Sequence, residues 1–217
     1  MTTCRGFTVF LLGPAIGCCL VGAAAQAQTT DNAEPLQRLE IGSGFSIAAP
    51  TGDGWRKTGD PASYLKILGP EHHSLVFMAN TGPSGITHQD ILGFREPGGV
   101  ARMIKLMAQF SERAGKAHAA GMPGERFESV ERVNEAGGKY NLGDFMCTYS
   151  RMVVRDREAV VDGSPTRLRY VAYSCLGFPD MRVAASVSYS ERGREQDLSE
   201  DAMVEGERFA RSLQRSK

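Results

Sequence analysis

The chain has 217 residues, of which 41% are hydrophobic, and its charge is balanced, with 25 basic and 25 acidic side chains. Balanced charge argues against a nucleic-acid-binding protein, because such binding needs a concentrated basic face that displaces counterions from phosphates. The length suits a single domain with its own core, and the sequence after residue 27 contains no internal repeat and no low-complexity tract.

The first 27 residues have the composition of a cleavable secretory signal. Arg5 precedes an apolar run and a stretch of small residues, which is the order found in signal peptides. Ala25-Gln26-Ala27 supplies the cleavage pattern, and the chain turns polar from Gln28 onward. We therefore predict a signal peptide over residues 1–27 and a periplasmic or secreted mature protein.

Cys18 gives the leader a competing interpretation. Ala15-Ile16-Gly17-Cys18 resembles the lipoprotein box, in which a small residue precedes a cysteine that becomes acylated. The residues after Cys18 stay apolar and small where lipoprotein tails usually turn polar, so we favour the cleavable signal over a lipid anchor at Cys18. No later segment approaches the roughly 18 uninterrupted apolar residues of a membrane span, and we expect none in the mature chain.

The ordered part of the chain is predicted to begin near residue 39. Residues 28–38 are polar and contain Pro35, which is typical of a linker or a disordered arm. We expect a single α+β domain over residues 39–217. Its first strand is predicted from Leu39 to Pro50, because apolar residues there occupy odd positions with the period of a half-buried strand.

Hydrophobic periodicity and turn residues predict the remaining elements. A loop rich in glycine and proline, with a short helix inside it, is predicted over residues 80–99. Amphipathic helices are predicted from Val100 to Gly115 and from an N-cap at Asp197 to the end of the chain. Further strands are predicted over residues 64–68, 75–78, 127–133, 142–154, 168–176 and 181–189.

Cys147 and Cys175 are the two cysteines that remain once the signal is removed. Two thiols sent to an oxidising compartment most simply form a disulfide. A hairpin folded near Val161 and Asp162 places the two cysteines nearly opposite each other, so we predict a cross-strand disulfide between them.

The order of these elements resembles the PsbP-type domain, a family named for an extrinsic subunit of photosystem II. The local similarity lies at Phe45, Ile47, Pro50 and Trp55, and the element order extends it over residues 39–213. The resemblance implies an α+β fold in which an antiparallel β-sheet is flanked by helices, an α/β/α sandwich. It also implies a non-catalytic accessory role in an exported compartment, and it supplies no photosynthetic role and no metal-binding residues.

Glu71, His72 and His73 are the strongest candidates for metal ligands, because imidazole and carboxylate are the usual ligands of zinc and copper. Adjacent residues in a turn diverge, and no H-x-H spacing accompanies them. His88 and His118 would complete a site only through a tertiary approach. We therefore interpret the histidine pair as a solvated hairpin tip and expect no metal site.

Residues 97–99 form a glycine-rich helix entry that could present backbone N–H groups to an anion. Arg95 and Arg102 would add positive charge there. We favour a plain helix entry, and we keep Arg95 and Arg102, with His72 and His73, as candidate ligand-binding residues.

No catalytic motif is present: the sequence contains no G-x-S-x-G, H-E-x-x-H, Walker-type or C-x-x-C pattern, so it names no catalytic residue and no cofactor. We expect a non-catalytic accessory or binding protein with a protein partner in the cell envelope. The alternative is a hydrolase-type enzyme whose site is assembled from scattered residues. Such an enzyme needs a pocket that holds a histidine within hydrogen-bond reach of a carboxylate and a nucleophile.

Signal cleavage is directly testable by mass spectrometry of the exported protein. We expect an N-terminus at Gln28, because the small-residue pattern ends at Ala27. A diacylglyceryl adduct on Cys18 would instead show that the chain is a lipoprotein, and an intact leader would contradict export by this route.

Overall fold

The computed structural model describes residues 37–69, 73–136, 138–177 and 181–216. The predicted signal peptide, the arm as far as residue 36, Cys18 and His72 lie outside these described residues. The described strands and helices all belong to one unit, Pro35–Lys217.

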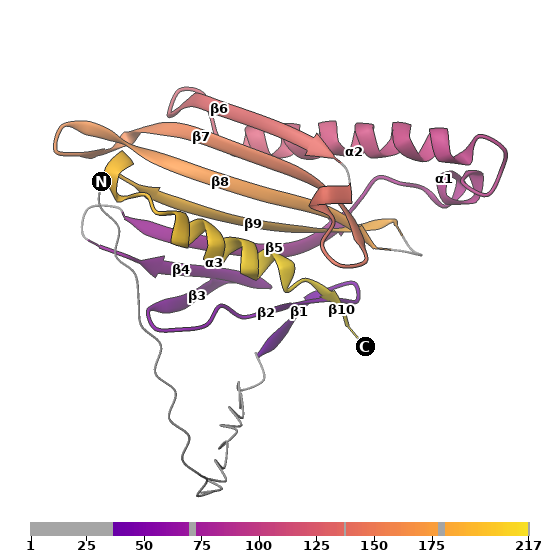
Figure 1. Cartoon of the computed structure of the whole chain (residues 1–217), viewed down its shortest axis with the longest axis horizontal. Coiled ribbons are helices and arrows are strands. Elements are labelled where there is room, and N and C mark those ends of the chain that lie inside the picture. The colour runs from indigo at the N-terminus through magenta and orange to yellow at the C-terminus, as the bar shows by residue number, and fades with distance from the viewer. Residues whose placement is uncertain (1–36, 70–72, 137, 178–180, 217) are drawn as a thin grey trace, which may run out of the picture. The chain divides into compact units, whose positions relative to one another are not determined.

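Strands account for most of the regular structure (Figure 1). The strands are β1 (Arg38–Gly42), β2 (Phe45–Ala48), β3 (Trp55–Gly59), β4 (Ala62–Ile67), β5 (Ser74–Pro83), β6 (Phe127–Ala136), β7 (Phe145–Val161), β8 (Ser164–Gly177), β9 (Val183–Gly193) and β10 (Gln214–Arg215). The helices are α1 (His88–Gly93), α2 (Gly99–Ala120) and α3 (Glu200–Arg211), with the 3₁₀ turns η1 (Gly138–Tyr140) and η2 (Glu195–Asp197).

These strands form two antiparallel sheets. The larger sheet has seven strands in the order β3-β4-β5-β9-β8-β7-β6, and the smaller has three in the order β1-β2-β10. β10 follows α3 directly and pairs with β2, so the end of the described chain joins the sheet formed by its beginning.

The seven-stranded sheet has two faces of different composition, because side chains alternate along a strand. We call the face that carries Val187 and Tyr189 of β9 the inner face, and the face that carries Ser186 the outer face. The inner face packs against α3 and the small sheet in the main hydrophobic core. Phe209 of α3 stacks on Phe77 of β5 there, with ring centroids 5.1 Å apart.

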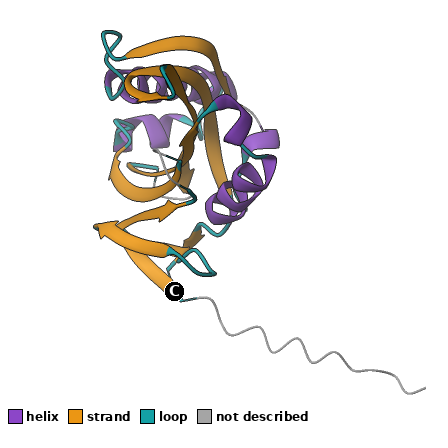
Figure 2. Cartoon of the chain, turned by 90° about the vertical axis from the view of Figure 1, so that its left-hand side faces the viewer, coloured by secondary structure: helices purple, strands orange, loops and turns teal. Residues whose placement is uncertain are grey.

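α2 lies over the outer face, on the opposite side of the sheet from α3 (Figure 2). Phe110 of α2 belongs to a buried cluster with Leu176 of β8 and Met181, and Met107 of α2 and Ala184 of β9 pack against that cluster. The contacts of α2 with the strands fall mainly on β6 and β7. One long helix therefore covers a part of this face and leaves space beside it.

The predicted fold class is wrong, because the described chain is mostly β and is not an α/β/α sandwich of helix-flanked layers. On the inner side α3 shares the core with a second, three-stranded sheet. The sequence pattern identified the long strands but not the short ones that build this sheet. A period-two pattern is strong in a long, half-buried strand and weak in the two residues of β10.

The segment from Leu39 to Pro50 is a hairpin, and the prediction of one continuous strand is wrong. β1 and β2 are joined by the turn Ser43-Gly44 and pair so that Leu39 lies opposite Ile47. Odd-numbered residues of both strands therefore share one face. The alternation continues through the turn unbroken, which hides the turn from a periodicity argument.

Both long helices differ from the prediction: α2 at its C-terminal end, and α3 at both ends, since it stops at Arg211 and the chain continues into β10. α2 continues through Gly115 to Ala120, so this glycine does not end the helix. α3 begins with an N-cap at Ser199, and Asp197 instead pairs with Arg194 at 2.6 Å within the preceding 3₁₀ turn. Both aspartate and serine can cap a helix, so the sequence alone did not show whether Asp197 or Ser199 is the N-cap.

The predicted disulfide between Cys147 and Cys175 is confirmed. The two residues lie directly opposite each other in the β7–β8 hairpin, with their Cα atoms 4.1 Å apart. The hairpin turns at Asp162 and Gly163. Their φ angles of 50° and 75° match a type I′ turn, in which the dipeptide Asp-Gly is favoured. A bulge in β7 between Asp156 and Val160 separates the register of the turn from the register that the disulfide holds.

Replacing both cysteines by alanine should destabilise the protein by about 3 to 4 kcal/mol, because the bond closes a loop of 28 residues in the unfolded chain. Urea denaturation of the variant and of the wild type measures the difference. Non-reducing peptide mapping of the wild type provides the control that the bond is present. Equal unfolding midpoints would contradict a stabilising role for the disulfide.

Candidate functional site

α2 is held to the outer face by few side chains. Among the α2 residues whose burial is described, Phe110 is the one large side chain that is buried. Met103 and Met107 are half-buried, and Ile104 is 66% exposed. A helix packed in this way leaves grooves along its sides rather than a closed interface.

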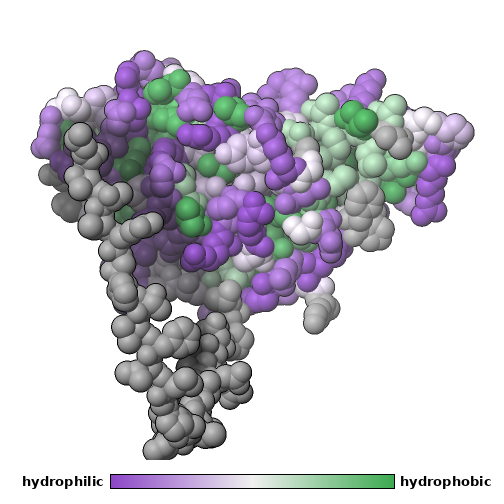
Figure 3. Space-filling view, in the orientation of Figure 1, coloured by the Kyte–Doolittle hydropathy of each residue, from purple (hydrophilic) through white to green (hydrophobic). Residues whose placement is uncertain are grey.

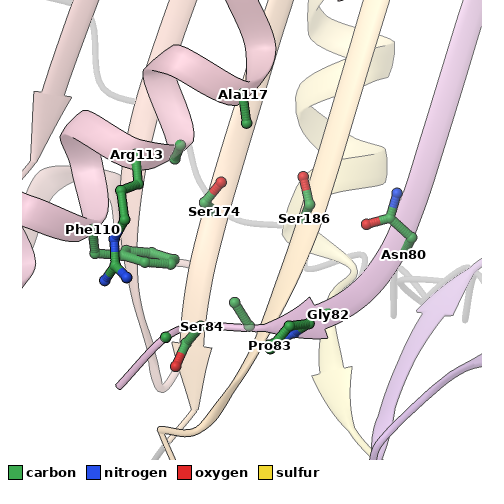
Figure 4. A pocket seen from close by; sticks show the side chains of 12 residues that line it. Asn80, Gly82, Pro83, Ser84, Phe110, Arg113, Ala117, Ser174 and Ser186 are labelled. Carbon is green, nitrogen blue, oxygen red and sulfur yellow. The ribbon is translucent and has the colours of Figure 1, made fainter. Parts of the chain in front are cut away.

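The groove on the β9 side of α2 is a candidate site, and we call it the α2 groove. Its volume is about 360 Å³. The polar and aromatic side chains that line it come from the end of β5, from β8, from β9 and from α2, and they include Asn80, Ser84, Phe110, Arg113, Ser174 and Ser186 (Figure 4).

Small polar residues form the floor of the α2 groove as a row across the strands. Asn80 of β5 lies opposite Ser186 of β9, and Ser186 lies opposite Ser174 of β8. Thr148 of β7 continues the row opposite Ser174. Short side chains leave the space above them open, and their hydroxyl and amide groups can both donate and accept hydrogen bonds. The floor is therefore suited to a polar ligand.

Arg113 supplies the positive charge of the α2 groove. Its guanidinium lies so close to Gly85 that a Cβ on that residue would collide with it, and Gly85 has a φ of 76° that disfavours other residues. Within the described part of the chain, Arg113 forms no hydrogen bond and no ion pair within 4 Å. The structure thus places an unpaired cation at the mouth of a groove lined by hydroxyl groups.

Asp90 of α1 is the acidic group that acts on Arg113 from a distance. Hydrogen bonds from Thr87 lower the pKa of Asp90, and the charge of Arg113 lowers it further. The Asp90 carboxylate is occupied by the Thr87 backbone N–H and hydroxyl, at 2.8 and 2.7 Å. Within the described residues, Asp90 and Arg113 form no ion pair within 4 Å.

Arg95 and Arg102, predicted as anion ligands, are placed differently. Arg102 donates to the backbone carbonyl of Pro97 at 3.2 Å and pairs with Glu96 at 3.2 Å. The backbone N–H of Gly99 donates to the Glu96 carbonyl, so that part of the helix entry is already hydrogen-bonded. Arg95 is exposed beside this turn. The structure does not bring the two arginines together around free backbone donors.

His73 lies beside a buried acid that the sequence analysis missed. Its Nε2 atom is 3.2 Å from Glu191 of β9, a residue with no exposed surface. The Glu191 carboxylate also pairs with Arg169 and accepts hydrogen bonds from the Ser199 backbone N–H. No hydroxyl or thiol among the described residues is hydrogen-bonded to His73. The pair therefore lacks the nucleophile that a hydrolase site requires.

Two tyrosines share the carboxylate of Glu207 on the inner face. Tyr173 and Tyr189 both donate to its Oε2 atom, at 2.7 and 3.0 Å, while Arg211 pairs with Oε1 at 2.7 Å. Burial, together with this negative charge, raises the pKa of both tyrosines well above its ordinary value. The phenols stay protonated as donors, so this cluster ties α3 to β8 and β9.

Asp156 of β7 is a second fully buried carboxylate. Arg126 binds it through two hydrogen bonds of 2.9 and 2.8 Å, and Arg192 lies 3.1 Å away. Burial alone would raise the pKa of Asp156, but these arginines lower it below its ordinary value. The group is therefore a paired, ionised carboxylate at neutral pH, and its contacts are those of a structural ion pair.

Comparisons with known proteins assign no identity to this arrangement. Neither a scan against protein-family models nor a search of curated proteins gave a match. The resemblance to the PsbP-type domain stays a prediction. In the residues that the structure describes, no cluster of three or more histidine, cysteine or acidic side chains could hold a metal ion. No described helix has both the length and the apolar character needed to cross a membrane.

Replacing Asp156 by asparagine should lower stability at pH 7 by about 1.5 to 3 kcal/mol, because the partly exposed Arg126 and Arg192 lose their anionic partner. The folded-state pKa of Asp156 is lowered, so its contribution is present above the unfolded value near 4 and is lost as pH falls through the folded value. Urea denaturation between pH 7 and pH 2.5 should show the two proteins converging in acid.

The matched control is Asp144→Asn, which changes an exposed aspartate in the turn before β7. That variant should follow the wild type at every pH. A constant difference between Asp156→Asn and the wild type across the acid range would contradict the pairing.

Proposed function

We propose that this chain is an exported, non-catalytic binding protein and that the α2 groove binds a small organic anion. The observation that carries the proposal is the unpaired guanidinium of Arg113 beside the polar row of Asn80, Ser186 and Ser174. A guanidinium presents a rigid fork of donors that matches a carboxylate, and neighbouring hydroxyls can complete its hydrogen bonds.

Apolar side chains on the α2 side of the groove favour an anion that also has a hydrocarbon part. Phe110, Ala114 and Ala117 of α2 face the space, together with Ala184 of β9. A ligand with one charged end and one apolar end would satisfy both walls. Binding sites for small molecules commonly combine such an apolar lining with a few oriented polar groups.

The chemistry of the groove supports binding rather than catalysis. A serine becomes a nucleophile only when a base removes its proton. The described residues that line the groove include two serines on the sheet but neither a histidine nor a carboxylate. Ser174 and Ser186 therefore serve as hydrogen-bond partners, while the hydrolase alternative and the protein partner in the cell envelope stay predictions.

Export is supported by the disulfide between Cys147 and Cys175 and by the composition of the leader. Disulfides persist in oxidising compartments and are rare in the cytosol. A periplasmic or secreted location is therefore part of the proposal, and signal cleavage at Gln28 is its direct test.

Binding of hexanoate tests the function. Calorimetric titration of the wild type should detect binding, and Arg113→Ala should weaken it by tenfold or more, since hydrogen bonds to charged groups contribute about 1.5 to 3 kcal/mol. Hexanol, which has the same chain without the charge, should bind more weakly than hexanoate.

Arg95→Ala is the matched control, because Arg95 is also an exposed arginine close to α2 but does not line the groove. It should bind hexanoate like the wild type. Loss of binding in Arg95→Ala with no change in Arg113→Ala would move the site to the helix entry, and no binding to the wild type would overturn the proposal.

A further inference from the structure

A second space opens beside α2, and we call it the methionine cleft. It has a volume of about 380 Å³. Three methionines line it, Met103 and Met107 of α2 and Met146 of β7. Its other walls are mostly small or aliphatic, and Figure 3 shows hydrophobic residues gathered over this part of α2. The cleft is therefore an apolar space that contains three thioethers.

The three methionines reach this space from two elements that face each other. Met103 and Met107 are four residues apart on α2, so their side chains lie on the same face of the helix. Met146 of β7 packs with Met107 against the buried cluster that contains Phe110. A methionine side chain has three rotatable bonds and adapts to its surroundings. Three such side chains around one cleft can turn their sulfur atoms toward a single ion without moving the backbone.

These methionines differ from the ones that fill the core. Met152 and Met181 are 2% and 1% exposed and belong to buried clusters, where a flexible side chain fills an irregular gap. Met103, Met107 and Met146 are instead half-buried beside open space. Core filling accounts for the first two residues, but it does not account for three thioethers around a cleft that they leave open.

The donors in the methionine cleft suit a soft cation. The described residues that line it include no histidine and no charged side chain. Cys147 also lines it, but its sulfur belongs to the disulfide and offers no thiolate. Zinc, calcium and magnesium bind histidine, thiolate or oxygen ligands, whereas a neutral thioether is a soft ligand that selects Cu(I). A monovalent ion also brings the smallest charge into apolar surroundings.

From this arrangement we infer that the methionine cleft binds one Cu(I) ion through the thioethers of Met103, Met107 and Met146. The cleft and the α2 groove have no lining residue in common, so the inference goes beyond the proposed function and does not depend on Arg113. It is also separate from the histidine pair, at which the sequence predicted no metal site.

Competition with bicinchoninate, a chromophoric Cu(I) ligand, tests the site anaerobically in ascorbate on the disulfide-bonded protein. We expect one Cu(I) per chain. Met107→Leu should weaken binding by about tenfold or more, because even indirect partners of a metal ligand contribute that much. Replacing all three methionines by leucine, which has nearly the same volume, should abolish binding. The matched control is Met78→Leu, since Met78 is exposed on β5 and does not line the cleft.

The pH dependence of binding separates thioether ligands from histidine. A thioether has no proton to lose when it binds a metal, so the Cu(I) affinity should be equal at pH 7.5 and pH 5.5 once the protonation of bicinchoninate is taken into account. An imidazole ligand has an ordinary pKa near 6.5 and would lose affinity over the same interval. A marked loss at pH 5.5 would therefore overturn the inference.

Silver(I) locates the site in the wild type without any substitution. It is a soft monovalent ion that stays in one oxidation state, and NMR of methyl-labelled methionine reports on each thioether. The methyl signals of Met103, Met107 and Met146 should shift together, while those of Met78 and Met203 stay in place. Shifts confined to other methionines, no Cu(I) binding by the wild type, or unchanged affinity in the triple variant would each contradict the inference. None of these results bears on the binding of hexanoate.

Discussion

The register of the β7–β8 hairpin is the constraint on which the rest of this structure depends. A shift by one residue would turn every side chain of a strand to the opposite face. Here the covalent bond between Cys147 and Cys175 fixes the register of the long paired segment, and a bulge between Asp156 and Val160 separates that segment from the two-residue turn at Asp162-Gly163. The two central strands therefore present a hydrophobic side to α3 and a hydroxyl-rich side to α2.

Two networks of buried ion pairs lie at the end of the sheet that carries the β7–β8 turn. Asp156 sits opposite Thr166 near the hairpin end, and Glu191 of β9 lies opposite Arg169 of β8. Each carboxylate is fully buried and each is bound by arginines. Charges buried in this way specify one arrangement, because an alternative register would leave an unpaired charge away from water. The two networks act as register locks.

The parts of the fold that could be predicted are those with strong local signals. The alternation in β9 correctly placed Ala185, Val187 and Tyr189 in the core, and the cysteine count with the turn residues gave the disulfide. The order of strands in the sheet, the small three-stranded sheet and the mostly β class depend on pairing between distant segments. Periodicity carries no information about which strands pair, so these features could not be derived from it.

The candidate site was missed for a related reason. The serines of β9 alternate with core residues, and that pattern by itself indicates only a polar face. Gly85 lies in a segment with several glycines and prolines, where no single glycine stands out, and Arg113 is one of many arginines in the chain. Their significance comes from one tertiary contact, in which a missing side chain at position 85 leaves room for the guanidinium. The signal in the sequence is this pair, Gly85 and Arg113. The two residues are far apart in the chain, so no local motif reveals it.

The loose packing of α2 links the fold to the proposed binding. Among the residues of the 22-residue α2 whose burial is described, one large side chain is buried, so the helix contributes less to stability than a fully packed helix of that length could. The inner face, with its aromatic contacts and the Glu207 cluster, is packed well enough to hold the domain together without a tight outer layer. The outer face is consequently free to keep short side chains and open space. A larger residue at Ser174 or Ser186 would bury more surface under α2, and it would do so by filling the groove.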